Sequence, residues 1–274
     1  MFNAAYFGVP GAYSEQAAIK YLGKASKLKG CKFLPEVFES ADTDSRVGVV
    51  PIENSIEGAV TQTYDLLLKS ELSIVGETIL EVSHCLMAPE GIRMADIRMV
   101  YSHPQALGQC REFLDRHGID SVPFYDTAGS ARMLKETKMK NTAAIASERA
   151  AKVYGMDVLA RKIQSSRHNY TRFLIISKDA KAKPPNKTTI AFSAKDRPGS
   201  LFKALNSFAD NGVNLLYIQS RPIPGTPWEY NFYVDCDGGI NSSNVKKAVE
   251  ELYDNSDFVK ILGSYPRARF GKNV

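Results

Sequence analysis

The chain has 274 residues, is 44% hydrophobic and carries a formal net charge of +5. This length predicts two domains with ordinary hydrophobic cores. The basic residues are scattered and not interleaved with aromatic side chains, which argues against nucleic-acid binding and fits a small anionic substrate equally well. No stretch approaches the ~20 apolar residues of a membrane span, and the N-terminus lacks a signal-peptide pattern. We therefore expect a soluble, cytoplasmic protein.

Strands and helices are expected to alternate through the first 180 residues. The expected strands are residues 4–8, 47–50, the largely extended 72–87, 99–102, 122–125, 143–146 and 171–177. The expected helices are residues 14–22, 59–69, 104–116, 127–136 and 148–154, with Ser14 as the N-cap of the first and Gly23 just past its end. The alternation predicts an α/β architecture with mostly parallel sheets.

A polar stretch with two adjacent prolines, residues 179–187, separates this region from a second one and is predicted to be a linker. The expected strands beyond it are residues 188–194, 214–221, 229–235 and 258–265, and the expected helices are residues 199–211 and 244–253. This order, βαββαβ, is the ferredoxin-like split motif. The predicted boundaries are a first domain at 1–180, a linker at 181–187 and a second domain at 188–274.

No sequence feature calls for a metal or an organic cofactor. The cysteines are widely spaced and predicted to be free, mostly buried thiols: Cys31, Cys85, Cys110 and Cys236. The four histidines lack metal-ligand spacing, and no H-E-x-x-H motif is present. The pair Gly8 and Gly11 is too short for a dinucleotide fingerprint. We therefore expect no metal and no cofactor.

Three strand-to-helix turns carry polar residues: 8–14, 102–105 and 125–130. Ligands of α/β sheets bind beyond the carboxyl ends of strands, and helix N-termini there favour anions. Several such turns around one crevice would suit a small dianion. Taken singly, each turn is more often an ordinary capped connection.

Two further polar segments can each be interpreted in two ways. The segment 53–58 (ENSIEG) follows an apolar strand and a proline. Its two carboxylates and its amide are explained equally well by a plain turn and by the polar floor of a pocket. Arg172 lies near the start of an apolar strand, where it could pair with a carboxylate or be a solvated side chain on an edge strand. His103 could be a base, although a capping or core histidine is more common. The residues alone indicate an α/β protein that binds a small anion.

At these positions the chain resembles the prephenate dehydratase family over nearly its whole length. The matching motifs are residues 8–15 (GVPGAYSE), 50–58 (VPIENSIEG), 102–110 (SHPQALGQC), 126–131 (DTAGSA), 144–147 (AIAS) and 169–173 (NYTRF). The second region resembles an ACT domain, through residues 196–201 (DRPGSL) and 220–222 (SRP). The resemblance implies two α/β lobes similar to type II periplasmic binding proteins, approximately 1–76 plus 160–180 and 77–159, with the active site in the cleft between them.

The resemblance also implies an activity, namely conversion of prephenate to phenylpyruvate, carbon dioxide and water in phenylalanine biosynthesis. Thr171 would donate a hydrogen bond to the departing hydroxyl, and Arg172 would pair with the pyruvyl carboxylate. The other implied catalytic residues are Asn54, Ser102, Gln109 and Glu53, of which Glu53 could instead be structural. The implied substrate-binding residues are Ser14, Ser55, His103, Asp126, Thr127, Asn169 and Phe173.

The ACT resemblance implies phenylalanine as an inhibitory effector and assembly as a homodimer or a dimer of dimers. The implied effector-binding residues are Gly199, Ser200, Leu201, Gln219, Ser220, Arg221 and Pro222. The family usually has glutamate where this chain has Gln219, which could weaken capture of an α-ammonium group; a domain that only dimerises is the alternative.

Three further expectations concern the activity as a whole. A fused chorismate mutase is not expected, because the sequence begins directly at the dehydratase motif. Arogenate dehydratase is the nearest alternative function, since the motifs do not separate the two substrates. A non-catalytic small-anion or amino-acid binding protein is the alternative from a different class.

Overall fold

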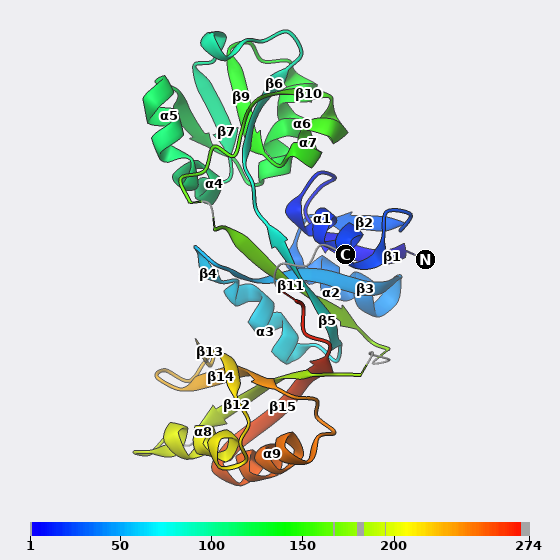
Figure 1. Ribbon diagram of the computed structural model, residues 1–274, viewed down its shortest axis with the longest axis vertical. Helices are drawn as coiled ribbons and strands as arrows, with labels where there is room; N and C mark the ends of the chain where they lie inside the picture. Colours follow the sequence, from blue (N-terminus) through cyan, green and yellow to red (C-terminus); the bar gives the residue numbers. More distant parts are fainter. Residues whose placement is uncertain (1, 167, 180–183, 195, 270–274) are drawn as a thin grey trace.

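The computed structural model describes residues 2–166, 168–179, 184–194 and 196–269. The chain folds into three bodies, each built on its own sheet (Figure 1). A first lobe lies in the middle, with a second lobe on one side and the C-terminal domain on the other. No helix in these described ranges is long and apolar enough to cross a membrane.

The first lobe combines the N-terminal third of the chain with a strand that returns from the second lobe. Its sheet has the order β2-β1-β3-β11-β5, with β4 paired to β3. The strands are β1 (Phe2–Phe7), β2 (Leu28–Cys31), β3 (Ser45–Asn54), β4 (Gly58–Ala59), β5 (Ser73–Glu81) and β11 (Tyr170–Ser177). The helices are α1 (Tyr13–Leu22), α2 (Leu34–Thr43) and α3 (Thr61–Lys69).

The second lobe has a sheet of order β10-β6-β9-β7-β8. Its strands are β6 (Cys85–Pro89), β7 (Met99–Ser102), β8 (Asp120–Pro123), β9 (Thr142–Ala146) and β10 (Met156–Arg161). Its helices are the short 3-10 helix η1 (Met94–Asp96), α4 (Pro104–Gln109), α5 (Arg111–His117), α6 (Thr127–Thr137) and α7 (Glu148–Tyr154). The chain crosses between the lobes at residues 82–84 and 162–169, whereas the sequence places these boundaries near residues 76 and 160.

The prediction of mostly parallel sheets is wrong. β1 is parallel to β2 and β3, but β11 is antiparallel to both of its neighbours. In the second lobe β7 is parallel to β8 and β9, whereas β6 is antiparallel to β9 and β10. Apart from the short antiparallel pair of β3 and β4, the antiparallel pairs involve the strands next to the two lobe crossings, where the chain enters or leaves a lobe without a crossover helix. Both sheets are therefore mixed.

Several predicted details differ from the structure. The sequence missed β2, α2 and β10, and the predicted helix 104–116 is broken at Cys110 into α4 and α5. Ser14 is not an N-cap: α1 begins after Ala12, without a capping side chain, and Ser14 lies buried within the helix. Glu15 instead accepts the backbone N–H of Gly11 at 2.8 Å. The four cysteines are buried free thiols, as predicted.

The C-terminal domain has the predicted βαββαβ order. Its elements are β12 (Lys187–Ala194), α8 (Ser200–Asp210), β13 (Leu215–Pro222), β14 (Tyr230–Asp237), α9 (Ser243–Asn255) and β15 (Ser256–Tyr265), in the sheet order β13-β14-β12-β15. The two helices pack on one face of this sheet (Figure 1). Of the predicted linker, residues 181–183 lie outside the described residues, and Lys187 already belongs to β12.

The other face of the C-terminal sheet shares a hydrophobic core with the first lobe. Tyr233, Leu262 and Tyr265 belong to the same buried cluster as Leu67 and Ile74. At one point the two backbones nearly touch, because a Cβ atom built on Gly263 would overlap the backbone of Ile74. The C-terminal domain is therefore packed firmly against the first lobe.

Candidate active site

Polar side chains from both lobes and both crossing segments meet at the junction of the lobes. We call this group the interlobe cluster; its members are Tyr13, Asn54, Glu57, His84, Gln109, Asn169 and Thr171. Asn54 ends β3 and lies opposite Thr171 of β11, while His84 and Asn169 lie in the two crossing segments. Gln109, at the end of α4, comes from the second lobe.

The orientation of Asn54 is fixed by the backbone. Its Oδ1 accepts the N–H groups of Ile56 at 2.9 Å and Glu57 at 3.0 Å, so its Nδ2 faces the crossing segment. That nitrogen donates to Thr171 Oγ1 at 2.9 Å and to Asn169 Oδ1 at 2.8 Å. Because Thr171 Oγ1 accepts this bond, its own proton is available to a ligand.

The donors and acceptors around Gln109 can also be assigned. Gln109 Nε2 donates to Glu57 Oε1 at 3.0 Å, since a carboxylate only accepts, and so Gln109 Oε1 must be the acceptor from Asn169 Nδ2 at 2.8 Å. His84 Nε2 lies 2.9 Å from the same oxygen and is therefore the donor. Burial lowers the pKa of His84 and so favours the neutral ring, in which the proton on Nε2 leaves none on Nδ1. The Tyr13 hydroxyl lies between this Nδ1, at 3.0 Å, and the carbonyl of Ser83, at 2.8 Å.

This directed network determines what the junction can do chemically. Gln109 ties the second lobe to Glu57 of the first, so the network spans the two lobes. It presents a neutral hydroxyl donor, Thr171, held by amides and not by a base. Across the described residues no group of three or more His, Cys, Asp or Glu side chains is placed to hold a metal ion. The site is suited to holding a polar small molecule and hydrogen-bonding one of its oxygens.

Two second-lobe candidates cap helices beside this cluster. His103 Nδ1 accepts the N–H of Gln105 at 3.3 Å, and Asp126 accepts the N–H of Gly129 at 3.0 Å. Burial lowers the pKa of His103, opposed by the nearby charges of Asp126 and Glu57. Thr127 opens α6 directly after Asp126. His103 thus lies within electrostatic reach of Glu57 in the first lobe and of Asp126 in its own lobe.

Replacing Asp126 with asparagine is expected to raise the Tm at pH 7. Burial raises the pKa of Asp126 above its ordinary value of 3.8, against the opposing effect of the backbone N–H of Gly129. Between pH 3.8 and the raised value the folded state holds a proton that the unfolded state has released, so stability falls as the pH rises through that window. Asparagine keeps a capping oxygen without the charge.

Thermal unfolding of both proteins at pH 7 and at pH 4 measures this effect. The Tm advantage of Asp126→Asn should shrink at the lower pH. A lower Tm for the variant at pH 7 would mean that the carboxylate is stabilised by its helix despite its burial.

Ser102 and Ser55 are engaged with the backbone. Ser102 is fully buried at the end of β7, and its Oγ donates to the carbonyl of Ile145 at 2.6 Å. Ser55 Oγ accepts the N–H of Tyr170 at 2.9 Å and donates to the carbonyl of His168 at 3.1 Å. Ser55 therefore fastens the second crossing segment to β3, next to Asn54.

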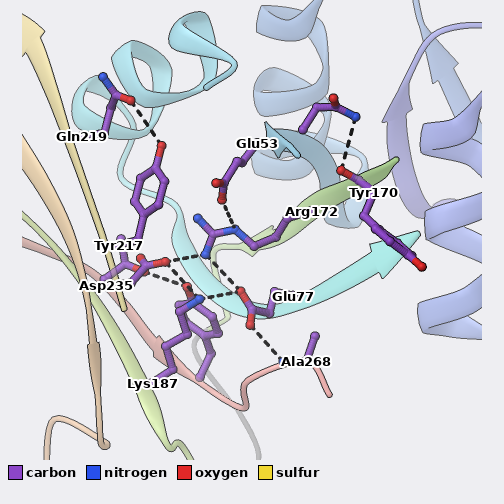
Figure 2. A network of polar contacts seen from close by, with 12 residues as sticks. Glu53, Glu77, Tyr170, Arg172, Lys187, Tyr217, Gln219, Asp235 and Ala268 are labelled. Atoms are coloured by element: carbon purple, nitrogen blue, oxygen red, sulfur yellow. Dashed lines mark hydrogen bonds and ion pairs between the residues drawn. The ribbon is translucent and has the colours of Figure 1, made fainter. Parts of the chain in front are cut away.

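Carboxylates of the protein itself already engage Arg172, which the family resemblance implied would pair with a substrate carboxylate. Neighbouring residues of a strand point to opposite faces, so Arg172 points away from Thr171 and toward the C-terminal domain (Figure 2). Its guanidinium contacts Glu53 at 3.3 Å, Glu77 at 3.4 Å and Asp235, and its side chain is only 12% exposed. Glu53 faces Arg172 for the same reason, and is not part of the interlobe cluster.

Phe173 is also misassigned as a substrate-binding residue. It is 1% exposed and packs in the core of the first lobe with Tyr6, Val49 and Ile175. Three members of the interlobe cluster were absent from the candidates: Tyr13, Glu57 and His84. The first two lie inside motifs that the sequence had singled out, whereas His84 lies in a stretch expected only to be extended.

The candidate effector residues fall into two separate places. Gly199, Ser200 and Leu201 line a pocket of about 370 Å³, together with Trp228. The segment from Gln219 to Pro222 lies in β13, an edge strand of the sheet, and is not part of this pocket. Gln219 accepts from the Tyr217 hydroxyl at 3.3 Å and donates to the carbonyl of Ser220 at 2.8 Å. Within one chain, therefore, residues 199–201 and residues 219–222 do not line a common pocket.

Arg221 of this segment is used in a contact between domains. It donates two hydrogen bonds to Asp65 of α3, at 3.2 and 2.7 Å. The contact joins β13 of the C-terminal sheet to α3 of the first lobe.

Family models and curated relatives agree with this architecture. A model described as prephenate dehydratase matches residues 4–181, and one described as ACT domain matches residues 188–252. A bifunctional chorismate mutase/prephenate dehydratase from Aquifex aeolicus is 40% identical, over 97% of this chain and 74% of its own length. Arogenate dehydratase/prephenate dehydratase 2 from Arabidopsis thaliana is also 40% identical, over 96% and 72%.

Solved structures share the whole arrangement. Prephenate dehydratase from Arthrobacter aurescens, in complex with L-Phe, has a TM-score of 0.88 and 33% identity, over 98% of this chain and 91% of its own. A protein described as GqqA, a novel type of quorum quenching acylase, has a TM-score of 0.90 and 33% identity, over 98% and 99%. The matched model covers the two lobes, and the relatives cover nearly the whole chain. The chain belongs to the prephenate dehydratase family, and its C-terminal domain is an ACT domain.

Proposed function

We propose that this chain converts prephenate to phenylpyruvate, carbon dioxide and water in phenylalanine biosynthesis. The observation that carries the proposal is the Thr171 hydroxyl, which Asn54 orients by donating to its oxygen at 2.9 Å. In this reaction the bond to the ring carboxylate breaks, and its electron pair moves through the diene to expel the C4 hydroxyl. The ring becomes aromatic, carbon dioxide leaves, and the hydroxide takes up a proton to form water.

Thr171 supports the departure of the hydroxyl by hydrogen bonding to it. A threonine hydroxyl is a weak acid, so its role is to stabilise developing negative charge and not to transfer a whole proton unaided. Gln109 and Asn169 would hold polar groups of the substrate beside it. Their mutual bond of 2.8 Å keeps both amides at the junction of the lobes.

The substrate carboxylates require a binding site other than Arg172. The start of α1 supplies one, because Ala12 offers no capping side chain and the first-turn N–H groups favour an anion. Ser14 is in that first turn. His103 and Thr127 would bind the substrate from the second lobe, with Asp126 holding the start of α6.

Steady-state assays with prephenate and with arogenate test the proposal. Phenylpyruvate is read by its ultraviolet absorbance in alkali, and phenylalanine from arogenate by chromatography. We expect turnover of prephenate; preference for arogenate would make the chain an arogenate dehydratase. No turnover of either substrate would favour a non-catalytic binding protein.

The acylase named among the similar structures suggests a different chemistry, which the site does not support. Acyl transfer by a side-chain nucleophile needs an adjacent general base or a depressed pKa. Thr171 Oγ1 is bonded to the Asn54 amide, which cannot serve as a base. The arrangement therefore favours hydrogen bonding to a leaving group over nucleophilic attack.

We propose further that phenylalanine binds the ACT domain and inhibits the enzyme, and that the chain is a cytoplasmic homodimer or dimer of dimers. A second copy could supply β13 to the pocket at Gly199, which one chain leaves without it. Titration calorimetry with phenylalanine tests the binding. We expect weak binding, because Gln219 lacks the negative charge that would attract an α-ammonium group, and no heat at millimolar phenylalanine would contradict the proposal. We expect no chorismate mutase activity, because the two domains match the dehydratase and ACT models.

Replacing Gly11 with alanine is expected to lower kcat/KM roughly tenfold or more, since misplacement by ~1 Å can cost 10²-fold. Gly11 has φ +91°, and a Cβ there would lie 2.7 Å from Cα of Ala150 in the second lobe. Ser147 Oγ also donates to the Gly11 carbonyl at 2.7 Å. An added methyl group would therefore push the lobes apart.

Gly23→Ala is the matched control for this prediction. Gly23 has a similar φ of +93° but nothing within 4 Å of its built Cβ, so it isolates the cost of backbone strain. We expect the control to lower stability and leave kcat/KM near wild type. Equal kinetic losses in both variants would show that strain, and not contact between the lobes, limits the reaction.

A further inference from the structure

A buried group of four charged residues joins the first lobe to the ACT domain. It lies on the face of β11 opposite to the one from which Thr171 points. We call it the interdomain charge cluster; it consists of Glu77, Arg172, Lys187 and Asp235 (Figure 2). Lys187 Nζ lies 2.9 Å from both Glu77 and Asp235, and Arg172 contacts the same two carboxylates. Side-chain exposure is 2% for Glu77, 5% for Lys187 and 4% for Asp235.

The ACT domain holds the Arg172 guanidinium from two directions. Asp235 of β14 bonds to Nη1, and the ring of Tyr217 from β13 lies 5.2 Å from the guanidinium carbon. Asp235 is itself fixed, because Thr189 donates to its other oxygen at 2.6 Å. Burial opposes its charge, but Arg172 and Lys187 more than offset burial and lower the pKa of Asp235. It is therefore a rigid carboxylate at neutral pH.

Arg172 and Thr171 share one peptide bond in β11. In the strand register Thr171 lies opposite Asn54 and Arg172 opposite Glu53, and a bulge follows Arg172. The ladder between β11 and β3 is therefore interrupted at this point, whereas the ladder with β5 is continuous from Tyr170 to Ile175. On the β3 side, side-chain contacts help to set the position of the strand.

We propose that Asp235 of the ACT domain is a positioning residue for the dehydration, acting through Arg172 on Thr171. Its carboxylate sets the place of the Arg172 guanidinium, and the backbone of β11 conveys that placement to the Thr171 hydroxyl. Turnover then depends on how the ACT sheet is seated against the first lobe, so a ligand that shifts β14 changes kcat. The inference rests on the proposed function of Thr171.

The test is Asp235→Asn, which keeps the shape of the side chain and removes its charge. We expect kcat for prephenate to fall about tenfold, within the range by which coupled residues modulate a remote site. KM should stay within roughly twofold, because Asp235 does not touch the interlobe cluster. Asp235→Glu restores the carboxylate and should recover part of kcat.

Asp65→Asn is the matched control, since it breaks a different ion pair between the same two domains. Asp65 pairs with Arg221 at 2.7 Å, lies on α3 and makes no contact with Arg172 among the ion pairs of that residue. We expect its kcat to equal that of wild type even where its stability is lower. Equal losses of kcat in Asp65→Asn and Asp235→Asn would overturn the proposal, because domain seating in general would explain both.

A double-mutant cycle measures whether Asp235 and Arg172 act on kcat together. A general loss of stability would not produce such coupling. In an Arg172→Gln background, Asp235→Asn should cause little further loss of kcat, because each substitution removes the same Asp235–Arg172 contact. The proposal would be overturned if the double variant lost kcat by the product of the two single-variant factors, because the two residues would then act independently. Should Asp235→Asn fail to fold, Thr189→Val removes only the hydroxyl that fixes Asp235, and an unchanged kcat there would equally overturn it.

The outcomes separate this inference from the proposed function. A wild-type chain without turnover would overturn the proposed function and this inference together. An active wild type whose kcat Asp235→Asn leaves unchanged would overturn the inference alone.

Discussion

Replacing Thr171 with alanine is expected to lower kcat for prephenate by roughly 10²–10⁴, the usual contribution of a positioned acid or donor. Hydroxide is a poor leaving group, and the variant would leave it without the donor that Asn54 orients at 2.9 Å. The remaining amides of the interlobe cluster still bind the substrate, so KM should change much less than kcat. Initial rates of phenylpyruvate formation over a range of prephenate concentrations measure both.

Two further variants at this position separate the hydroxyl from the shape of the side chain. Thr171→Ser keeps the donor and should retain much of the activity. Thr171→Val keeps the branched shape without the hydroxyl and should be as impaired as alanine. The assignment of Thr171 fails should the alanine variant turn over at close to the wild-type rate.

Replacing Lys187 with methionine is expected to lower the free energy of unfolding by about 3–5 kcal/mol, the usual cost of removing one partner of a buried ion pair. Lys187 Nζ is 2.9 Å from both Glu77 and Asp235, and its side chain is 5% exposed. Methionine fills similar space but leaves two buried carboxylates to share Arg172 alone. Urea denaturation followed by circular dichroism measures the difference, with the m-value as a check on two-state behaviour.

Lys29→Met is the control for this prediction, because Lys29 makes an equally short pair in an exposed setting. Its Nζ is 2.8 Å from Asp44, and the two side chains are 39% and 43% exposed. Solvent screening makes such pairs weak, so only a small loss is expected. Similar losses in the two variants would mean that the interdomain charge cluster contributes no more than a surface pair.

The parts of the fold that were predicted well have complete local signals. The predicted helix at 148–154 coincides with α7, which has a side-chain cap from Ser147 and a left-handed Gly155 at its end. The missed elements have incomplete signals. α2 has Pro35 and Glu36 in its first turn, but its N-cap residue, Phe33, cannot cap with a side-chain oxygen. β2, Leu28–Cys31, is a four-residue edge strand that contains a glycine.

The candidate site was predictable in part for a similar reason. Motifs drew attention to Asn54, Gln109 and Thr171, and the structure brings these three to one network. Their catalytic roles remain predictions. His84 could not be found, because no motif surrounds it and its function depends on partners supplied by folding. The partner of Arg172 was equally hidden, since Asp235 lies in another domain.

The core shared by the ACT sheet and the first lobe limits how this enzyme can be taken apart. Tyr233, Leu262 and Tyr265 fill the same apolar interior as Leu67 and Ile74. Cleavage between the domains would leave two fragments that stay associated, and the lobes expressed alone would expose an apolar surface and tend to aggregate. A chimera that borrows an ACT domain from a relative would need its whole sheet face exchanged, together with the surface of the first lobe that receives it.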